Sequence, residues 1–156
     1  MSGNPAELGL NLPPADARAR LQRLAYTILS PSLGRRRRTL IAHVAVDGAF
    51  SSGELIPGST YPMLRERVVR RTLTTGRRRA VLATRAAGRP RPTAMTPSIG
   101  EPELAWLLPA ARAAYALRHL EGLDRTETHA VLAAAGVGDP ATATTLADRI
   151  LTDAQP

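Results

Sequence analysis

Apolar residues recur with the spacing of an α-helix near the start of the chain. From Asp16 onward they stand at positions i, i+3, i+4, i+7 and i+8, which is the pattern of a helix with one buried face. Pro31 and Gly34 then end the pattern, because both residue types interrupt helices. The predicted inward face consists of Leu21, Leu24, Ala25, Ile28 and Leu29.

Two further helices are predicted before residue 88. One covers roughly residues 35–50, with an inward face made of Leu40, Ile41, Val44 and Phe50. The next begins near Thr60, where Pro62 suits a first turn, and its apolar stripe consists of Leu64, Val68 and Leu73. Two ends are compatible with this pattern: Gly76 caps the helix, or the helix continues to Gly88.

The second half of the chain opens with two more helical segments. A helix from Pro109 to Gly122 has a proline at its start and a glycine at its end, as many helices do. A shorter helix is predicted before it, after Gly100, and carries Leu104, Trp106, Leu107 and Leu108.

The last two helices are marked by capping residues. Asp124 is a helix N-cap, and Glu127, three positions later, is its reciprocal capping partner. Asp139 followed by Pro140 marks the start of the final helix. The predicted inward faces consist of Leu123, Val131 and Leu132 for the first, and Ala143, Leu146 and Ile150 for the second.

The chain shows no strand pattern of any length, and the predicted fold class is therefore all-α. Residues 88–102 are rich in Pro and Gly, which is the composition of a linker. We expect a flexible N-terminus (1–15), a helical unit (16–87), the linker, and a helix-turn-helix-like unit (103–156).

The amino-acid composition excludes several kinds of functional site. The chain has no Cys, which excludes disulfides and thiolate metal sites, and all 21 of its basic residues are Arg. Without Lys there is neither a P-loop lysine nor a Schiff-base lysine. His43, His119 and His129 are not spaced as a ligand pair on one helix. We therefore expect no catalytic residue, no metal site, no cofactor and no enzyme activity.

The N-terminal sequence and the length of the apolar runs indicate the expected cellular compartment. No apolar run approaches the length that spans a bilayer, and residues 1–17 have neither a basic n-region nor an apolar h-region. The expectation is a cytoplasmic protein with no membrane partner, associated with the nucleoid if it binds DNA. The net charge of +8 and the pI of about 11.4 favour phosphate backbones or acidic protein surfaces as partners.

One segment of the second half resembles a known family. The stretch "LPAARAAYALRHLEGLDRTETHAVL", residues 108–132, is similar to the start of the C-terminal DNA-binding region (region four) of extracytoplasmic-function sigma factors. In that family a leucine-proline start, an arginine-rich helix, an "EGL" turn and a capped acidic helix precede the recognition helix. The resemblance implies a helix-turn-helix in which residues 140–153 stand at the DNA-reading position.

The first half resembles region two of the same family. "RLQRLAYTIL" (20–29) is similar to its first helix and "AVDGAF" (45–50) to the end of its second. "YPMLRERVVRRTLTTGRRR" (61–79) resembles the helix that touches the −10 promoter element. The resemblance implies a transcription-related protein with duplex DNA, the RNA polymerase core and a regulatory protein as partners.

The chain also departs from the family. Acidic residues on the second helix of region two contact the polymerase clamp, and here that helix starts with Arg35, Arg36, Arg37 and Arg38. Like charges would repel a basic clamp surface. Two interpretations of the four arginines stay open: a solvated helix start, or a loop or bound anion that makes them a site for phosphate or an acidic partner.

The aromatic residues and the final helix point away from a competent sigma factor. Tyr26 and Phe50 look like core residues, and only Tyr61 is expected near a DNA face. The final helix is expected to expose threonines, Asp148 and Arg149, and its aspartates would repel a phosphate backbone. The candidate DNA-contacting residues are Arg65, Arg67, Arg70, Arg71, Arg77, Arg78, Arg79, Arg125, Thr142, Thr144, Thr145 and Arg149.

Two functional hypotheses follow. The first is a transcription-related regulator that binds DNA, RNA polymerase or both and is not a fully competent sigma factor. The second is a sigma-like interaction module that binds an acidic protein partner or an anionic nucleotide without reading DNA. A third alternative, that the chain is the N-terminal portion of a longer protein, also stays open.

Overall fold

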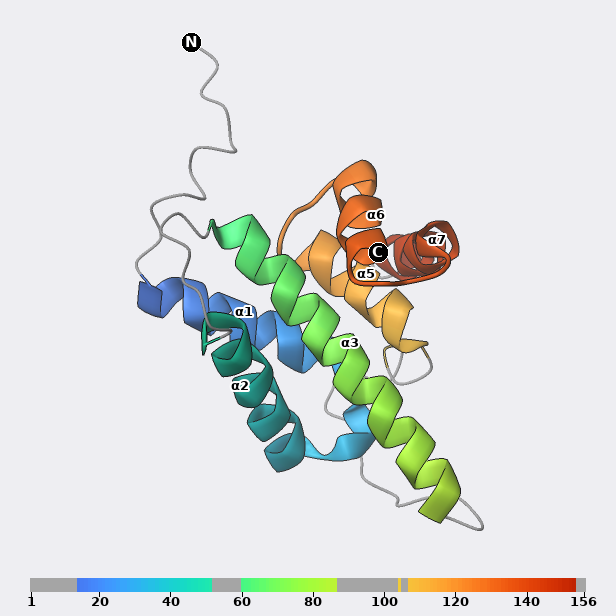
Figure 1. Cartoon of the computed structure of the whole chain (residues 1–156). Helices are drawn as coiled ribbons and strands as arrows, with labels where there is room; N and C mark the ends of the chain where they lie inside the picture. The colour runs from blue at the N-terminus through green and yellow to red at the C-terminus, as the bar shows by residue number, and fades with distance from the viewer. Residues whose placement is uncertain (1–13, 52–59, 87–103, 105–106, 154–156) are drawn as a thin grey trace.

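The computed structural model describes residues 14–51, 60–86, 104 and 107–153. Within these ranges the chain forms helices joined by short turns and contains no strand, which confirms the all-α prediction (Figure 1). The elements are α1 (Pro14–Ile28), a 3-10 helix (Pro31–Leu33), α2 (Arg35–Ser51), α3 (Tyr61–Ala86), α5 (Pro109–His119), α6 (Arg125–Ala134) and α7 (Pro140–Asp153).

The long helix α3 lies between the two halves of the molecule. Figure 1 shows α1 and α2 on one side of α3 and the orange-red helices α5, α6 and α7 on the other. Helix α1 also packs against α5, which brings the first and second halves of the chain into direct contact. The predicted linker, residues 88–102, lies outside the described residues.

Both halves contribute to one continuous core. Leu21 and Leu24 of α1, Val68 of α3, Leu117 of α5 and Leu132 of α6 are fully buried and belong to the same cluster. The predicted inward face of α1 is confirmed, since all of its members are buried. The buried stripe of α3 also agrees with the sequence pattern.

Helix α2 turns a different face inward from the one predicted. Ile41 is buried as expected, but Leu40 and Val44 are 66% and 62% exposed, and Phe50 is only half-buried. The buried face consists instead of Arg38, Ile41, Ala42, Ala45, Val46 and Ala49. Alanine allows α2 to approach α1 and α3 closely, and this close approach leaves the larger side chains at the edge of the contact.

Helix α3 continues through Gly76 to Ala86, so Gly76 is not its C-cap. Gly76 has no positive φ, which a glycine cap of the usual kind requires. The arginines and alanines that follow favour the helical state and carry the helix onward.

The predicted caps of the second half are present. Asp124 Oδ1 accepts from the Glu127 amide at 2.8 Å, and Glu127 Oε2 accepts from the Asp124 amide at 2.9 Å. Asp139 Oδ1 accepts from the Thr142 amide at 3.0 Å at the start of α7. Gly136, with φ +82, supplies the left-handed residue in the turn between α6 and α7. Of the predicted short helix after Gly100, Trp106 lies outside the described residues, and Leu104 is buried.

Candidate binding groove between α2 and α3

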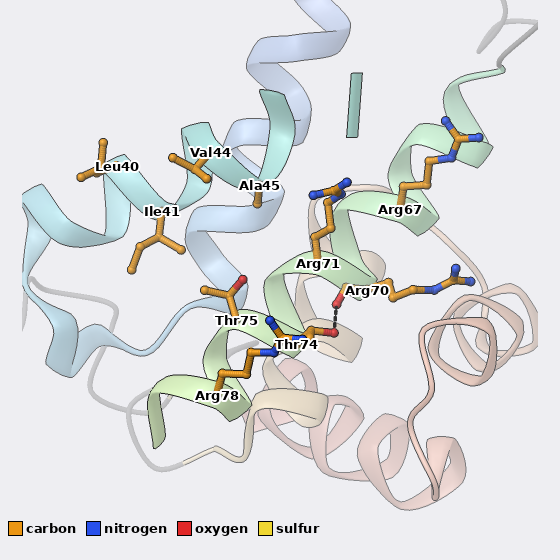
Figure 2. Close-up of a pocket in the computed structure, with 10 residues that line it drawn as sticks. All are labelled: Leu40, Ile41, Val44, Ala45, Arg67, Arg70, Arg71, Thr74, Thr75 and Arg78. Carbon is orange, nitrogen blue, oxygen red and sulfur yellow. Dashed lines mark hydrogen bonds between the residues drawn. The ribbon is translucent and has the colours of Figure 1, made fainter. Parts of the chain in front are cut away.

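A groove of about 640 Å³ runs between α2 and α3. One wall is apolar and consists of Leu40, Ile41, Val44 and Ala45 of α2. The other wall is basic and hydroxylic, and Figure 2 shows the residues that form it, which are Arg67, Arg70, Arg71, Thr74, Thr75 and Arg78 of α3. No acidic side chain is among the described residues that line the groove.

The apolar wall follows from the way α2 is packed. Leu40 and Val44 stand four residues apart and therefore lie on one face of the helix, next to each other. Their exposure is unusual for large aliphatic residues in the described chain, most of which are buried. Two large aliphatic side chains are therefore exposed next to each other, beside a row of cations.

The basic wall follows from helical spacing on α3. Arg67, Arg71, Thr74 and Arg78 stand at i, i+4, i+7 and i+11 and share one face of the helix. In Figure 2 Arg71 extends from α3 toward α2. Its Nη1 atom would lie 2.6 Å from a Cβ atom added at Gly48, so the glycine makes room for the guanidinium.

Two arginines of the predicted DNA-contacting set hold the second half of the molecule, and one of them, Arg70, also lines the groove. Arg70 donates to the carbonyl of Ala134 from Nε (3.2 Å) and Nη2 (2.8 Å), and Nη2 also bonds to Glu66. Arg77 donates to the carbonyl of Gly136 at 3.5 Å. Both cations therefore lie at the C-terminal end of α6, where a positive charge complements the helix dipole. In the structure some arginines of the predicted stripe line the groove, Arg77 contacts the end of α6, and Arg70 does both.

Arg65 belongs to a buried cluster around Glu121. The Glu121 side chain is fully buried, and its Oε1 accepts from the Tyr61 hydroxyl at 2.9 Å and from Arg20 Nε at 3.1 Å. Arg65 Nη1 lies 3.6 Å from Oε2. Tyr61, the aromatic residue expected near a DNA face, is buried, and the guanidinium of Arg20 in α1 lies over its ring. Burial and the Glu121 carboxylate raise the pKa of Tyr61 above its ordinary value.

The four consecutive arginines form the first turn of α2, which excludes the loop interpretation. Arg35, Arg36 and Arg37 are exposed, whereas Arg38 is 2% exposed. Arg38 donates to the carbonyl of Tyr26 and stacks 4.0 Å above the Tyr26 ring. Three of the four arginines therefore remain available as a surface site, and the fourth belongs to the interior.

The candidate DNA contacts of the second half are mostly engaged within the protein. Arg125 donates to Thr145 Oγ1 at 2.9 Å and lies 3.9 Å from Asp148, which also pairs with Arg118 at 2.7 Å. The expectation that Thr144 is exposed is wrong: it is fully buried and donates to the carbonyl of Pro140. Thr142 and Arg149 are exposed.

The N-terminus of α7 already holds an anion of its own. Asp139 accepts from the amide and the hydroxyl of Thr142, and these hydrogen bonds lower the pKa of its carboxyl group. A DNA phosphate at this helix end would meet that carboxylate. The face that a helix-turn-helix would present to DNA is therefore poorly prepared to hold a phosphate backbone.

The described residues bring together no group of three or more His, Asp or Glu side chains arranged to hold a metal ion. No helix within the described ranges has the length and apolar character to cross a membrane. The side chain of Arg79 lies outside the description.

Sequence reasoning missed the apolar wall of the groove. Leu40 and Val44 were assigned to the core because hydrophobic periodicity ranks large aliphatic residues above alanine. The run of alanines at positions 42, 45 and 49 was the available signal, since small residues mark the face where helices approach closely. No local pattern in the sequence indicates that Glu121 is buried, because its partners belong to α1 and α3.

Comparison of the chain with models of protein families, with curated proteins and with solved structures gives no match.

Proposed function

We propose that this protein is a sigma-like interaction module whose α2–α3 groove binds an acidic, amphipathic helical segment of a partner protein. The observation that carries the proposal is the pairing of two exposed aliphatic side chains with a row of arginines across one groove. The aliphatic pair alone or the arginine row alone would not define a partner. Together they favour a ligand that has one apolar face and one acidic face.

The dimensions of the groove suit a helix. From Arg67 to Arg78 helix α3 advances about 16 Å, which is three turns of an α-helix. An incoming helix of the same length could set aliphatic side chains at i and i+4 against Leu40 and Val44. Its carboxylates, three turns apart, would then reach Arg67 and Arg78.

Charge supports a partner of this kind over a neutral one. The groove carries no acidic side chain among its described lining residues, and the whole chain has a net charge of +8. A positive groove steers acidic partners toward it and disfavours basic ones.

The second candidate is a transcription-related regulator that binds duplex DNA, the RNA polymerase core or both. The exposed arginines at the start of α2 and along α3 favour it, because a row of cations along a helix can follow a phosphate backbone. Duplex DNA, however, would leave Leu40 and Val44 without an apolar counterpart.

One binding experiment separates the two candidates. Three fluorescent helical peptides are compared: an acidic amphipathic peptide, its composition-matched scrambled form, and a version with Lys in place of Glu. We expect saturable binding of the first alone, and at least about tenfold weaker binding (about 1.4 kcal/mol) by the double variant L40S/V44S. The variant M63S, which alters an exposed side chain outside the groove lining, should bind like the wild type.

The charge requirement is tested in parallel. The variant R67Q/R78Q should lose affinity for the acidic peptide, whereas R23Q/R149Q, which removes two exposed arginines outside the groove, should keep it. Equal affinity for the acidic and scrambled peptides would contradict the proposal. Duplex DNA is titrated at several salt concentrations: a log–log slope near −3, lost in R67Q/R78Q, would support the second candidate instead.

A further inference from the structure

A second cavity lies where α1 ends, next to α3, and shares only Thr75 with the lining of the groove. Its volume is about 340 Å³, and its lining is mostly apolar: Ile28, Leu29, Leu33, Leu73 and Pro109. Cavities of this size hold small molecules in other proteins. Among the described lining residues the cavity has no acidic group and a single charged one, Arg112 of α5.

Arg112 is a buried cation whose described ionic surroundings contain no carboxylate. The residue is 5% exposed, its Nε donates to the carbonyl of Ile28 at 2.8 Å, and Nη1 donates to the carbonyl of Leu107. Among the described residues no Asp or Glu forms an ion pair with it. Burial and the nearby Arg38 lower the pKa of Arg112 to about 10, which leaves the guanidinium charged at neutral pH.

Backbone capping accounts for the position of Arg112 but not for its charge. Arg38 and Arg112 both donate to carbonyls of the last turn of α1, Tyr26 and Ile28. The end of a helix carries only about half a negative charge, which offsets the full charge of the Arg112 guanidinium only in part. A buried cation is costly unless an anion compensates it.

We propose that this cavity binds a small amphipathic carboxylate, with its head group on Arg112 and its alkyl tail against Leu29, Leu33 and Leu73. A carboxylate accepts hydrogen bonds from a guanidinium in a fork geometry, and the buried setting strengthens them. The apolar lining would hold a short chain of methylene groups. The inference does not depend on the proposed partner groove, whose lining shares only Thr75 with this cavity.

Gly76 gives a way to block the cavity without disturbing the fold. It lines the cavity, and a Cβ atom at this position would meet no atom within 4 Å. It also lies one turn after Thr72 and Leu73, which line the same cavity. G76L therefore adds a side chain on the cavity face, and G76A adds only a methyl group as the matched control.

The test uses the full chain with three probes in isothermal titration calorimetry: octanoate, 1-octanol and acetate. We expect saturable binding of octanoate that is at least about tenfold tighter than that of 1-octanol or acetate, which lack the head or the tail. G76L should abolish octanoate binding and G76A should retain it. R112Q, where it folds, should bind octanoate and 1-octanol equally.

Two outcomes would overturn the inference. One is octanoate binding no tighter than that of acetate, which would indicate nonspecific contact with surface arginines. The other is unchanged octanoate affinity in G76L, which would place the binding elsewhere. Because G76L keeps Arg112, the second outcome is decisive even if R112Q does not fold.

Discussion

At the scale of single residues, the most constrained group is the carboxylate of Glu121. It lies in the turn after α5, and its partners are Tyr61 and Arg65 of α3 and Arg20 of α1. The cluster therefore connects both halves of the molecule through one fully buried acid. Removing one member of such a cluster leaves the others unpaired in the interior, which is costly.

Replacing Tyr61 by Phe tests this cluster through its pH dependence. Below pH 10 the variant should be less stable by about 2 kcal/mol, because a hydrogen bond to a charged acceptor is lost. The folded-state pKa of Tyr61 is raised, so unfolding releases its proton above pH 10, and the wild type loses its advantage there. Urea unfolding of both proteins between pH 7 and 11 should show a difference that shrinks above pH 10.

The difference in the free energy of unfolding between the wild type and Y61F removes the contribution of groups that titrate in both proteins, such as Arg112. The lowered pKa of Arg112 makes the free energy of unfolding rise with pH, which is opposite to the effect of Tyr61, because the folded state releases the Arg112 proton first. Parallel stability profiles for the wild type and Y61F would contradict the role given to this hydroxyl.

At the scale of elements, local capping residues set where α6 and α7 begin. Asp124 and Glu127 exchange two hydrogen bonds between side chain and backbone, and the partners are separated by a single turn. Such a motif needs no tertiary contact, which explains why the pattern was visible in the sequence. The cap of α7 is equally local, since Asp139 accepts hydrogen bonds from the amide and the hydroxyl of Thr142.

The variant D124A should be less stable by about 1 kcal/mol, because the amide of Glu127 loses its acceptor. D124S, which retains a capping oxygen, should recover most of this loss. T126A, at an exposed position in the first turn of α6, is the matched control and should change the free energy of unfolding little. Equal stabilities of D124A and D124S would show that the cap contributes nothing.

At the scale of the whole molecule, α3 and the shared core make the two halves mutually dependent. Leu24 of α1 and Leu117 of α5 belong to one buried cluster, and Arg70 and Arg77 of α3 hold the end of α6. Loss of either half would expose the apolar face of the other. The halves should therefore unfold together.

The variant L117A tests this dependence. It should lower the stability of the whole chain by about 2–5 kcal/mol, because it leaves a cavity in the shared core. Amide hydrogen exchange in α1 should accelerate in L117A as much as exchange in α5. A loss of protection confined to α5–α7, with α1 unchanged, would indicate two units that unfold independently.

The sequence by itself determined the features that depend on neighbours along the chain. Helical periodicity located most of the helices, and Asp124, Glu127 and Asp139 marked their starts, because both signals act within a few residues. It also determined the high Arg content and the net charge of +8, since charge is a sum over composition.

Only the tertiary structure decided what each side chain does. The rotation of α2 that exposes Leu40 and Val44 depends on how closely its alanines approach α1 and α3. The division of the arginines into groove residues, α6 contacts and buried cations depends on which distant carbonyl or carboxylate each one reaches. Those partners lie up to 101 positions away in the chain, beyond the range of any local pattern.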